Sequence, residues 1–104
     1  MDAVLTQVLG DALERLRDKD DRLALLTITG VHTDPDLRHA TVYLASLPVG
    51  AAPALEARRL ELQAAIAHEV RLKRTPTLTF LADPAIEAAE RVEEALRRAR
   101  RDES

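Results

Sequence analysis

The stretch "LLTITGVHTDPDLRHATVYLASL", residues 25–47, decides the fold, because two alternating runs flank one turn sequence. Before the turn, leucine and isoleucine alternate with threonine. After it, Ala40, Val42 and Leu44 occupy every second position. A period of two residues is typical of a strand with one buried face. The "DPD" of residues 34–36 favours a tight turn, so the stretch predicts a β-hairpin.

A helix precedes the hairpin. Between residues 4 and 16, apolar residues recur at spacings of three and four, which places them on one helical face. The charged "RDKDDR" of residues 17–22 predicts the end of this helix in a solvated turn. Within the first strand, Gly30 predicts a β-bulge or a close approach of another segment.

A second helix follows the hairpin. The loop "LPVGAAP" of residues 47–53 ends in a proline that suits the first helical turn, and the helix is expected to run to about Lys73. Pro76 forbids further helix. The residues expected to form its buried stripe are Leu55, Leu62, Ile66 and Val70.

A third strand and a last helix complete the order. "TLTFL", residues 77–81, predicts a short strand. Asp83 is expected to cap the last helix, with Pro84 at its first position. The predicted buried stripe of this helix is Ile86, Ala89, Val92 and Leu96.

The predicted element order is α-β-β-α-β-α. Since a strand–helix–strand connection is right-handed in nearly all proteins, the third strand is expected to lie parallel to the second, giving sheet order 1-2-3. The fold class is therefore α+β, with a three-stranded sheet and helices on one face. We expect a single domain over residues 1–100 and a charged tail over residues 101–104.

Composition narrows the possible functions. The chain has 104 residues, a formal net charge of -3 and no cysteine, which excludes disulfides and cysteine-based zinc sites. A signal peptide and a membrane span are not expected, and the expected location is the cytoplasm. The net charge argues against indiscriminate binding to nucleic acid.

The densest basic charge lies between residues 58 and 74, where five basic side chains accompany two acidic ones. Arginine binds phosphate oxygens through two parallel hydrogen bonds. Cations that follow a helix also complement the helix dipole, so an ordinary helix end is the alternative explanation. The candidate phosphate-binding residues are Arg58, Arg59, Arg71, Lys73 and Arg74.

Three stretches carry a family resemblance. The hairpin of residues 25–47 has an aspartate–leucine step after its turn and then a valine–tyrosine pair. Residues 71–83, "RLKRTPTLTFLAD", join a basic segment, a proline and a leucine-x-phenylalanine strand, and residues 86–96, "IEAAERVEEAL", form the closing helix. In these features the sequence resembles ribosome-binding factor A, a family of bacterial assembly factors for the small ribosomal subunit.

The resemblance implies a type II KH-like fold and a function in ribosome biogenesis. It implies binding to the precursor of the small (30S) subunit, help in 16S rRNA processing and maturation, and RNA contact by the basic residues near the subunit's neck. It also implies release by a GTPase and action without catalysis or cofactor, and we expect a monomer. The alternative is a non-catalytic protein-interaction module of the same fold with weak or lost RNA binding. In such a module the closing helix would dock on a partner protein.

The chain departs from the family at two places. No basic residue precedes Arg15, although the family has a longer basic start. The family also has a kinked Ala-x-Gly junction between two helices, which would fall near residues 58–60, where this chain has no glycine. Those residues are good helix formers, so a continuous helix is an equally good expectation.

The sequence provides little support for a catalytic site or a metal site. His32, Asp34, Asp36 and His39 could each bind a metal, but the aspartates beside Pro35 are ordinary turn formers, and we expect no metal site. No nucleophile–base arrangement or glycine-rich phosphate loop is visible, so the chain is not expected to be an enzyme.

Overall fold

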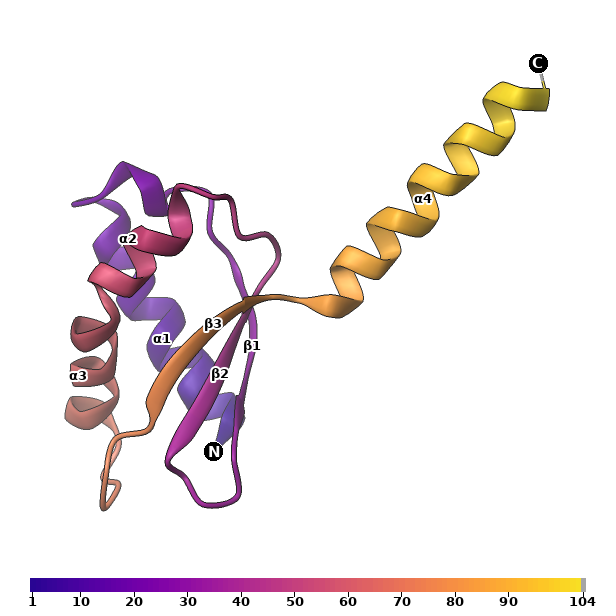
Figure 1. Cartoon of the computed structure of the whole chain (residues 1–104). Coiled ribbons are helices and arrows are strands. Elements are labelled where there is room, and N and C mark those ends of the chain that lie inside the picture. The colour runs from indigo at the N-terminus through magenta and orange to yellow at the C-terminus, as the bar shows by residue number, and fades with distance from the viewer. Residues whose placement is uncertain (104) are drawn as a thin grey trace.

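The computed structural model describes residues 1–103 and consists of a three-stranded sheet and helices (Figure 1). Strand β1 pairs antiparallel with β2, and β3 pairs parallel with β2, in the order β1-β2-β3. The predicted α+β class and sheet order are therefore confirmed. The elements are α1 (Asp2–Arg17), a 3-10 turn η1 (Asp21–Leu23), β1 (Ile28–Thr33), β2 (His39–Leu44), α2 (Ala51–Ala57), α3 (Arg59–Glu69), β3 (Thr77–Ala82) and α4 (Pro84–Glu103).

The predicted hairpin is confirmed. Its turn closes where the Asp34 N–H donates to the His39 carbonyl at 2.9 Å. The Leu37 N–H donates to the Asp34 carbonyl at 2.9 Å, and Leu37 adopts a left-handed conformation with φ of 61°. The β1–β2 register shifts between Ile28 and Gly30, which is the predicted bulge. Within residues 1–103, a Cβ placed on Gly30 would meet no heavy atom within 4 Å, so the bulge and not a close contact at this position accounts for the irregularity.

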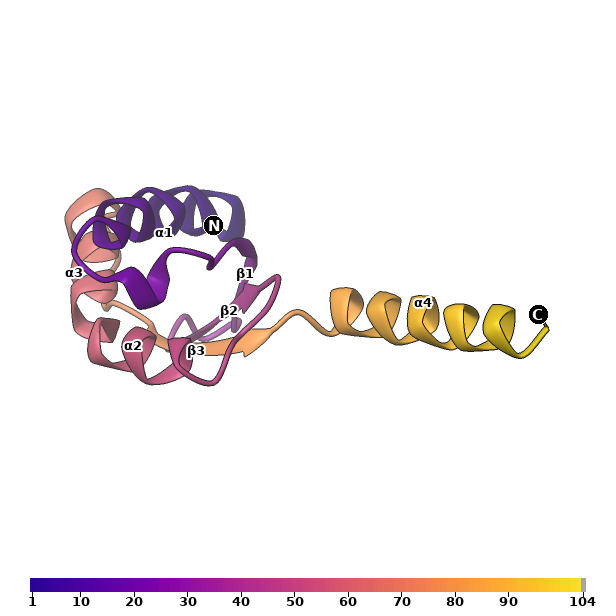
Figure 2. The same ribbon diagram turned by 90° about the horizontal axis from the view of Figure 1, so that it is seen from above.

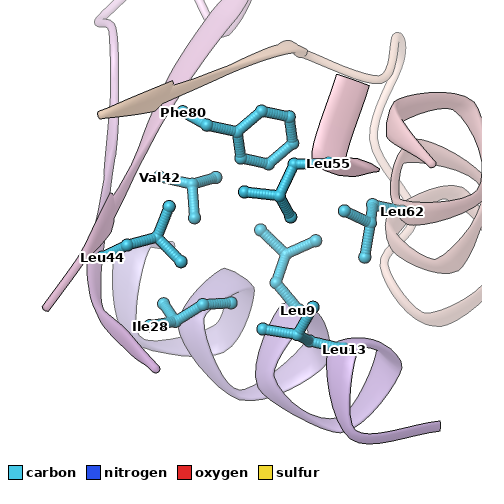
Figure 3. A pocket seen from close by; sticks show the side chains of 8 residues that line it. All are labelled: Leu9, Leu13, Ile28, Val42, Leu44, Leu55, Leu62 and Phe80. Atoms are coloured by element: carbon cyan, nitrogen blue, oxygen red, sulfur yellow. The ribbon is translucent and has the colours of Figure 1, made fainter. Parts of the chain in front are cut away.

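The core lies between the sheet and the helices α1, α2 and α3 (Figure 2). The apolar period of α1 buries Leu5, Leu9, Leu13 and Leu16, as the spacing predicts. Figure 3 shows the centre, where apolar side chains from both layers point toward one another. The void between them is about 10 Å³, too small for any ligand. The residues around it are Leu9, Leu13, Ile28, Val42, Leu44, Leu55, Leu62 and Phe80.

The second helix is not continuous. Arg58 interrupts it with φ of -100° and ψ of 3°, so α2 and α3 form a kinked pair. This backbone conformation lies in the bridge region, which residues other than glycine can adopt. The Arg58 N–H still donates to the Leu55 carbonyl at 3.0 Å, and the Leu62 N–H donates to the Arg58 carbonyl at 3.0 Å. The family's junction is therefore present without its glycine.

The second helix also ends earlier than predicted. It stops at Glu69 rather than near Lys73, because Val70 is extended with φ of -126° and ψ of 128°. From this extended segment Val70 and Leu72 both pack against the core. Tertiary packing therefore outweighs the helical preference of residues 70–73.

The last helix begins as predicted but is not buried. The Ala85 N–H donates to the Asp83 carboxylate at 2.9 Å, so Asp83 caps α4. The predicted buried stripe is wrong, since Val92 and Leu96 are 59% and 52% exposed. Among the helices of residues 1–103, α1, α2 and α3 cover the sheet, whereas α4 extends away from it (Figure 2).

Two features explain why α4 leaves the sheet. The inner face is already filled by the other helices, and the outer face carries mostly threonine and other polar side chains. Its members on β2 and β3 are His39, Thr41, Tyr43, Thr77, Thr79 and Leu81. The radius of gyration is consequently 16.3 Å, against about 13 Å for a compact chain of this length.

The start of α4 is fixed to the sheet at Asp83. Its backbone N–H donates to the Leu44 carbonyl at 2.7 Å, and the Thr29 hydroxyl donates to its carboxylate at 2.7 Å. The Thr29 hydroxyl and the Ala85 N–H hold the pKa of Asp83 below its ordinary value. One aspartate thus joins β1, β2 and the first turn of α4.

The core assignment predicts the effect of two leucine substitutions. Leu9→Ala is expected to lower the free energy of unfolding by about 2–5 kcal/mol, because Leu9 is fully packed and leaves a cavity. Leu25→Ala removes the same atoms from a side chain that is 86% exposed, and the change should stay within about 0.5 kcal/mol. Urea unfolding measures both changes in the free energy of unfolding. Equal decreases in the two variants would contradict the assigned core.

The Asp83 contacts predict a pH dependence of the α4 start. Since the pKa of Asp83 is lowered in the folded state, its stabilising contribution is present above the ordinary aspartate value and is lost as the pH falls through the lowered value. Amide NMR signals of Ala85 and Thr29 should shift together in that acid range. Asp83→Asn should abolish this titration, whereas Asp18→Asn, an exposed change on another element, should leave it intact. Unchanged titration in Asp83→Asn would refute the assignment.

Candidate nucleic-acid interface

Three of the predicted phosphate-binding residues lie together in the segment between α3 and β3. Arg71, Lys73 and Arg74 are all exposed there. The Val70 N–H donates to the Ile66 carbonyl at 2.8 Å at the start of this segment, and Pro76 is buried at its end. Both ends of the basic segment are therefore anchored while its charged side chains face solvent.

The turn between β1 and β2 forms the other side of this site. The Thr77 N–H donates to the Arg38 carbonyl at 2.8 Å, which joins the first residues of β2 and β3. A hollow of about 470 Å³ is lined by residues of both loops. The two loops lie at the lower end of the molecule in Figure 1. We call this hollow the basic groove, and its lining residues are Asp36, Leu37, Arg38, Arg71, Leu72, Lys73 and Arg74.

The cations of the basic groove are not neutralised by the protein. Within residues 1–103, none of the side chains of Arg38, Arg71, Lys73 and Arg74 makes an ion pair. The one acid in the groove, Asp36, accepts a hydrogen bond from the Arg38 backbone N–H at 2.9 Å. Four cationic groups are therefore available to phosphate oxygens.

The helix-dipole explanation does not fit this segment. The dipole acts within the last turn of a helix, and α3 ends at Glu69. Arg71, Lys73 and Arg74 all follow that end, beyond the extended residue Val70.

The other two predicted residues lie at the opposite end of α3. With 11 residues, α3 separates Arg58 and Arg59 from the basic groove by about 16 Å. Arg58 Nη1 lies 2.7 Å from Glu61 Oε1, and Arg59 Nε lies 3.6 Å from Glu56 Oε2. The five predicted residues therefore form two groups. Arg71, Lys73 and Arg74 line the basic groove and make no ion pair within residues 1–103. Arg58 and Arg59 are paired with glutamates at the other end of α3.

Arg38 was missing from the predicted site, although the sequence contained a signal for it. The start of two paired parallel strands lies at the same sheet edge, and His39 pairs with Thr77. The loops that precede these strands therefore meet, and they carry Arg38 on one side and Arg71, Lys73 and Arg74 on the other. The predicted parallel pairing was sufficient to place them together.

The hairpin turn also gathers three residues of the kind that bind metals. Ligand atoms of Asp34, Asp36 and His39 lie within 4.8 Å of one another, while His32 points toward Asp2, with 3.7 Å between Nδ1 and Oδ2. The cluster adjoins the cations of the basic groove, whose charge opposes a further cation. We assign Asp34 and Asp36 to the turn.

Base stacking has little support from the aromatic residues. Phe80 points into the core (Figure 3), and Tyr43 is half-buried on the outer face of the sheet. The groove therefore provides charge rather than aromatic surface. Within residues 1–103, no helix combines the length and hydropathy that crossing a membrane requires.

Known proteins match the chain over most of its length. Residues 1–96 match the family model of ribosome-binding factor A. The ribosome-binding factor A of Rubrobacter xylanophilus is 39% identical over 102 residues, covering 93% of this chain and 82% of that protein. The protein of the same name from Acidothermus cellulolyticus is 41% identical over 98 residues, which cover 89% of this chain and 65% of the longer relative.

Solved structures match the fold. The crystal structure of ribosome-binding factor A from Thermus thermophilus has a TM-score of 0.70 at 35% identity and covers 77% of this chain and 88% of its own. A homology model of the Thermus thermophilus protein, fitted into a cryo-electron-microscopy map of a 30S–ribosome-binding factor A complex, has a TM-score of 0.67 at 35% identity, covering 80% and 91%. With the family match and its curated relatives, these structures show that the chain belongs to the ribosome-binding factor A family.

Proposed function

We propose that this protein binds the small ribosomal subunit precursor through rRNA phosphates held in the basic groove. The observation that carries the proposal is that four cations from two loops converge and none is neutralised within the described chain. Membership of the family supports it, as does the fitted complex of the Thermus thermophilus relative with the 30S subunit.

The basic groove is suited to positioning the RNA backbone rather than to recognising particular bases. The guanidinium groups of Arg38, Arg71 and Arg74 can each donate two hydrogen bonds to phosphate oxygens, and Lys73 adds a compact positive charge. Phosphate contacts fix orientation but do not discriminate sequence, so the shape of the folded rRNA supplies the selectivity.

Arg58 and Arg59 form a second, weaker contact in this proposal. Their acidic neighbours Glu61 and Glu56 reduce the charge that they offer to RNA. A phosphate at the α2–α3 junction has to compete with these carboxylates. The junction therefore contributes less than the groove.

The proposed role is stoichiometric assistance in 16S rRNA processing and maturation. The groove contains cations and one turn-forming aspartate, which bind and orient phosphates without a covalent step. One copy acts on one precursor in the cytoplasm, and release by a GTPase completes the cycle.

A second candidate function is a protein-interaction module with weak or lost RNA binding. The neutralised charges of Arg58 and Arg59 favour it, because the region of the family's junction then offers RNA little net charge. The two functions differ in whether binding depends on the basic groove.

Charge reversal in the groove tests the RNA contact. Arg71→Glu with Arg74→Glu should weaken binding to small-subunit precursors on the order of a hundredfold, because two charge-assisted contacts are lost. The dependence of binding on salt should also become less steep by about one unit of logarithmic slope for each lost phosphate contact. Filter binding at several salt concentrations measures both, with thermal unfolding to check that the melting temperature is nearly unchanged.

Two matched variants carry the same change in charge elsewhere. Arg58→Glu with Arg59→Glu should give a smaller loss of affinity than the groove pair. Arg15→Glu with Lys19→Glu, both exposed near the end of α1, should leave binding unchanged. A groove pair that binds as well as the wild type at physiological salt would contradict the RNA contact and favour the protein-interaction module.

The maturation role predicts where the protein sediments. In a cell extract separated on a sucrose gradient, it should be recovered with free small subunits and their precursors, because these present the immature rRNA. Translating ribosomes should carry little of it. Equal recovery from every ribosomal fraction would argue against an assembly role while leaving the groove contact to the binding experiment.

A further inference from the structure

One apolar side chain of the basic groove does not serve the core. Leu37 lines the groove and is 38% exposed, and within residues 1–103 it is not among the apolar residues that pack against the core. A single exposed leucine is ordinary on a protein surface. Leu37 differs because it stands beside four cations, in the hollow where we place the rRNA backbone.

The backbone at Leu37 is also unusual. Its φ of 61° lies in the left-handed region, where leucine is strained and glycine or asparagine is favoured. In the described chain, Leu37 is the one residue other than glycine with a positive φ. Asparagine could form the same turn without strain, so the turn does not account for the leucine. Strained residues of this kind cluster at binding sites.

The acid of the groove is the third unusual feature. Asp36 Oδ1 accepts the Arg38 backbone N–H at 2.9 Å, and in the described part of the chain the Asp36 carboxylate makes no ion pair. A carboxylate only accepts hydrogen bonds, and it repels phosphate. A groove that bound the RNA backbone alone would be weakened by Asp36 and would gain nothing from Leu37.

An unpaired nucleotide has groups that suit all of these side chains. Its phosphate binds the cations, and its base offers an apolar face to Leu37. Every RNA base also has an N–H donor on its Watson–Crick edge, which Asp36 can accept. In a duplex the base faces are stacked and these edges are paired, so neither is accessible.

The size of the groove fits one nucleotide. Its volume of about 470 Å³ lies within the range of about 300–1,000 Å³ that is typical of small-ligand sites. We propose that the basic groove binds an unpaired nucleotide of a single-stranded rRNA segment, with the base against Leu37 and its Watson–Crick edge facing Asp36.

This inference rests on the proposed function, because it assumes that the groove binds rRNA phosphates. It adds the class of RNA that the groove accepts, which is an unpaired strand rather than a helix. No particular base is required, since each base has an apolar face and an N–H donor. Selectivity therefore depends on how the rRNA is folded, because folding decides which nucleotides are unpaired.

Binding of two matched RNAs tests the proposal. An unstructured RNA oligonucleotide is compared with the same strand annealed to its complement, using the full chain at one salt concentration. The single strand should bind at least about tenfold more tightly. A groove that binds only the backbone should prefer the duplex, because the duplex has the higher charge density. Equal affinities or a preference for the duplex would overturn the proposal.

Leu37→Asn tests the contact with the base. It should lower single-strand affinity on the order of fivefold, because the apolar contact is lost, and leave duplex affinity unchanged. The melting temperature should stay the same or rise, because asparagine tolerates the left-handed conformation. Leu37→Met keeps an apolar side chain and should retain the preference for the single strand. A Leu37→Asn variant with the preference of the wild type contradicts the contact.

Asp36→Asn tests the acid. The amide oxygen can still accept the Arg38 N–H, while the charge that repels phosphate is removed. Duplex binding should therefore tighten, whereas single-strand binding should not gain, because the stronger acceptor for the base is lost. The preference for the single strand should narrow. An equal gain for both RNAs would show that Asp36 does not face a base.

The groove pair Arg71→Glu with Arg74→Glu separates this inference from the proposed function. The proposal predicts that the pair loses affinity for the single strand. If the pair loses affinity but the wild type does not prefer the single strand, the groove remains the RNA contact and the unpaired nucleotide alone is refuted. If the pair binds both RNAs as well as the wild type does, the inference and the proposed function fail together.

Discussion

The parallel pairing of β3 with β2 is the constraint on which the rest of the structure depends. Parallel neighbours need a crossover, and here α2 and α3 supply it and cover the sheet together with α1. The same pairing places the starts of the two strands at one edge and their ends at the other. The basic groove forms at the first edge because both preceding loops carry arginine. At the second edge, Asp83 meets Leu44 and directs α4 away from the sheet.

The separation of these edges reconciles a net charge of -3 with a cationic site. The strands have six residues each, so the start and the end of the sheet lie about 20 Å apart. This distance is more than two Debye lengths at physiological ionic strength, which are about 8 Å each. The glutamates of α4 therefore do not cancel the potential of the groove. Net charge describes the solubility of this protein better than it describes its binding surface.

The sequence predicts those features that short-range chemistry determines. The turn around Pro35 and the capping of α4 by Asp83 each depend on residues within a few positions. The end of the second helix at Glu69 was missed, because the packing of Val70 and Leu72 against the core decides it. The break at Arg58 was not predictable in the same way, since its backbone conformation is accessible to most residues and is selected by packing. The exposure of α4 was also missed, because an amphipathic pattern reports an apolar face without saying what covers it. Whether the predicted RNA-binding residues contact RNA stays a prediction.

The single aspartate at the base of α4 makes this helix a lever. A helix about 30 Å long turns a rotation of about 10° at its base into a tip displacement of about 5 Å. The direction of that lever is set by the bonds from Thr29 and Ala85 to one carboxylate and by the backbone bond to Leu44. A small rotation at Asp83 therefore produces a large displacement of the arginine-rich end of α4. The position of that end depends on how rigidly the Asp83 side chain is held.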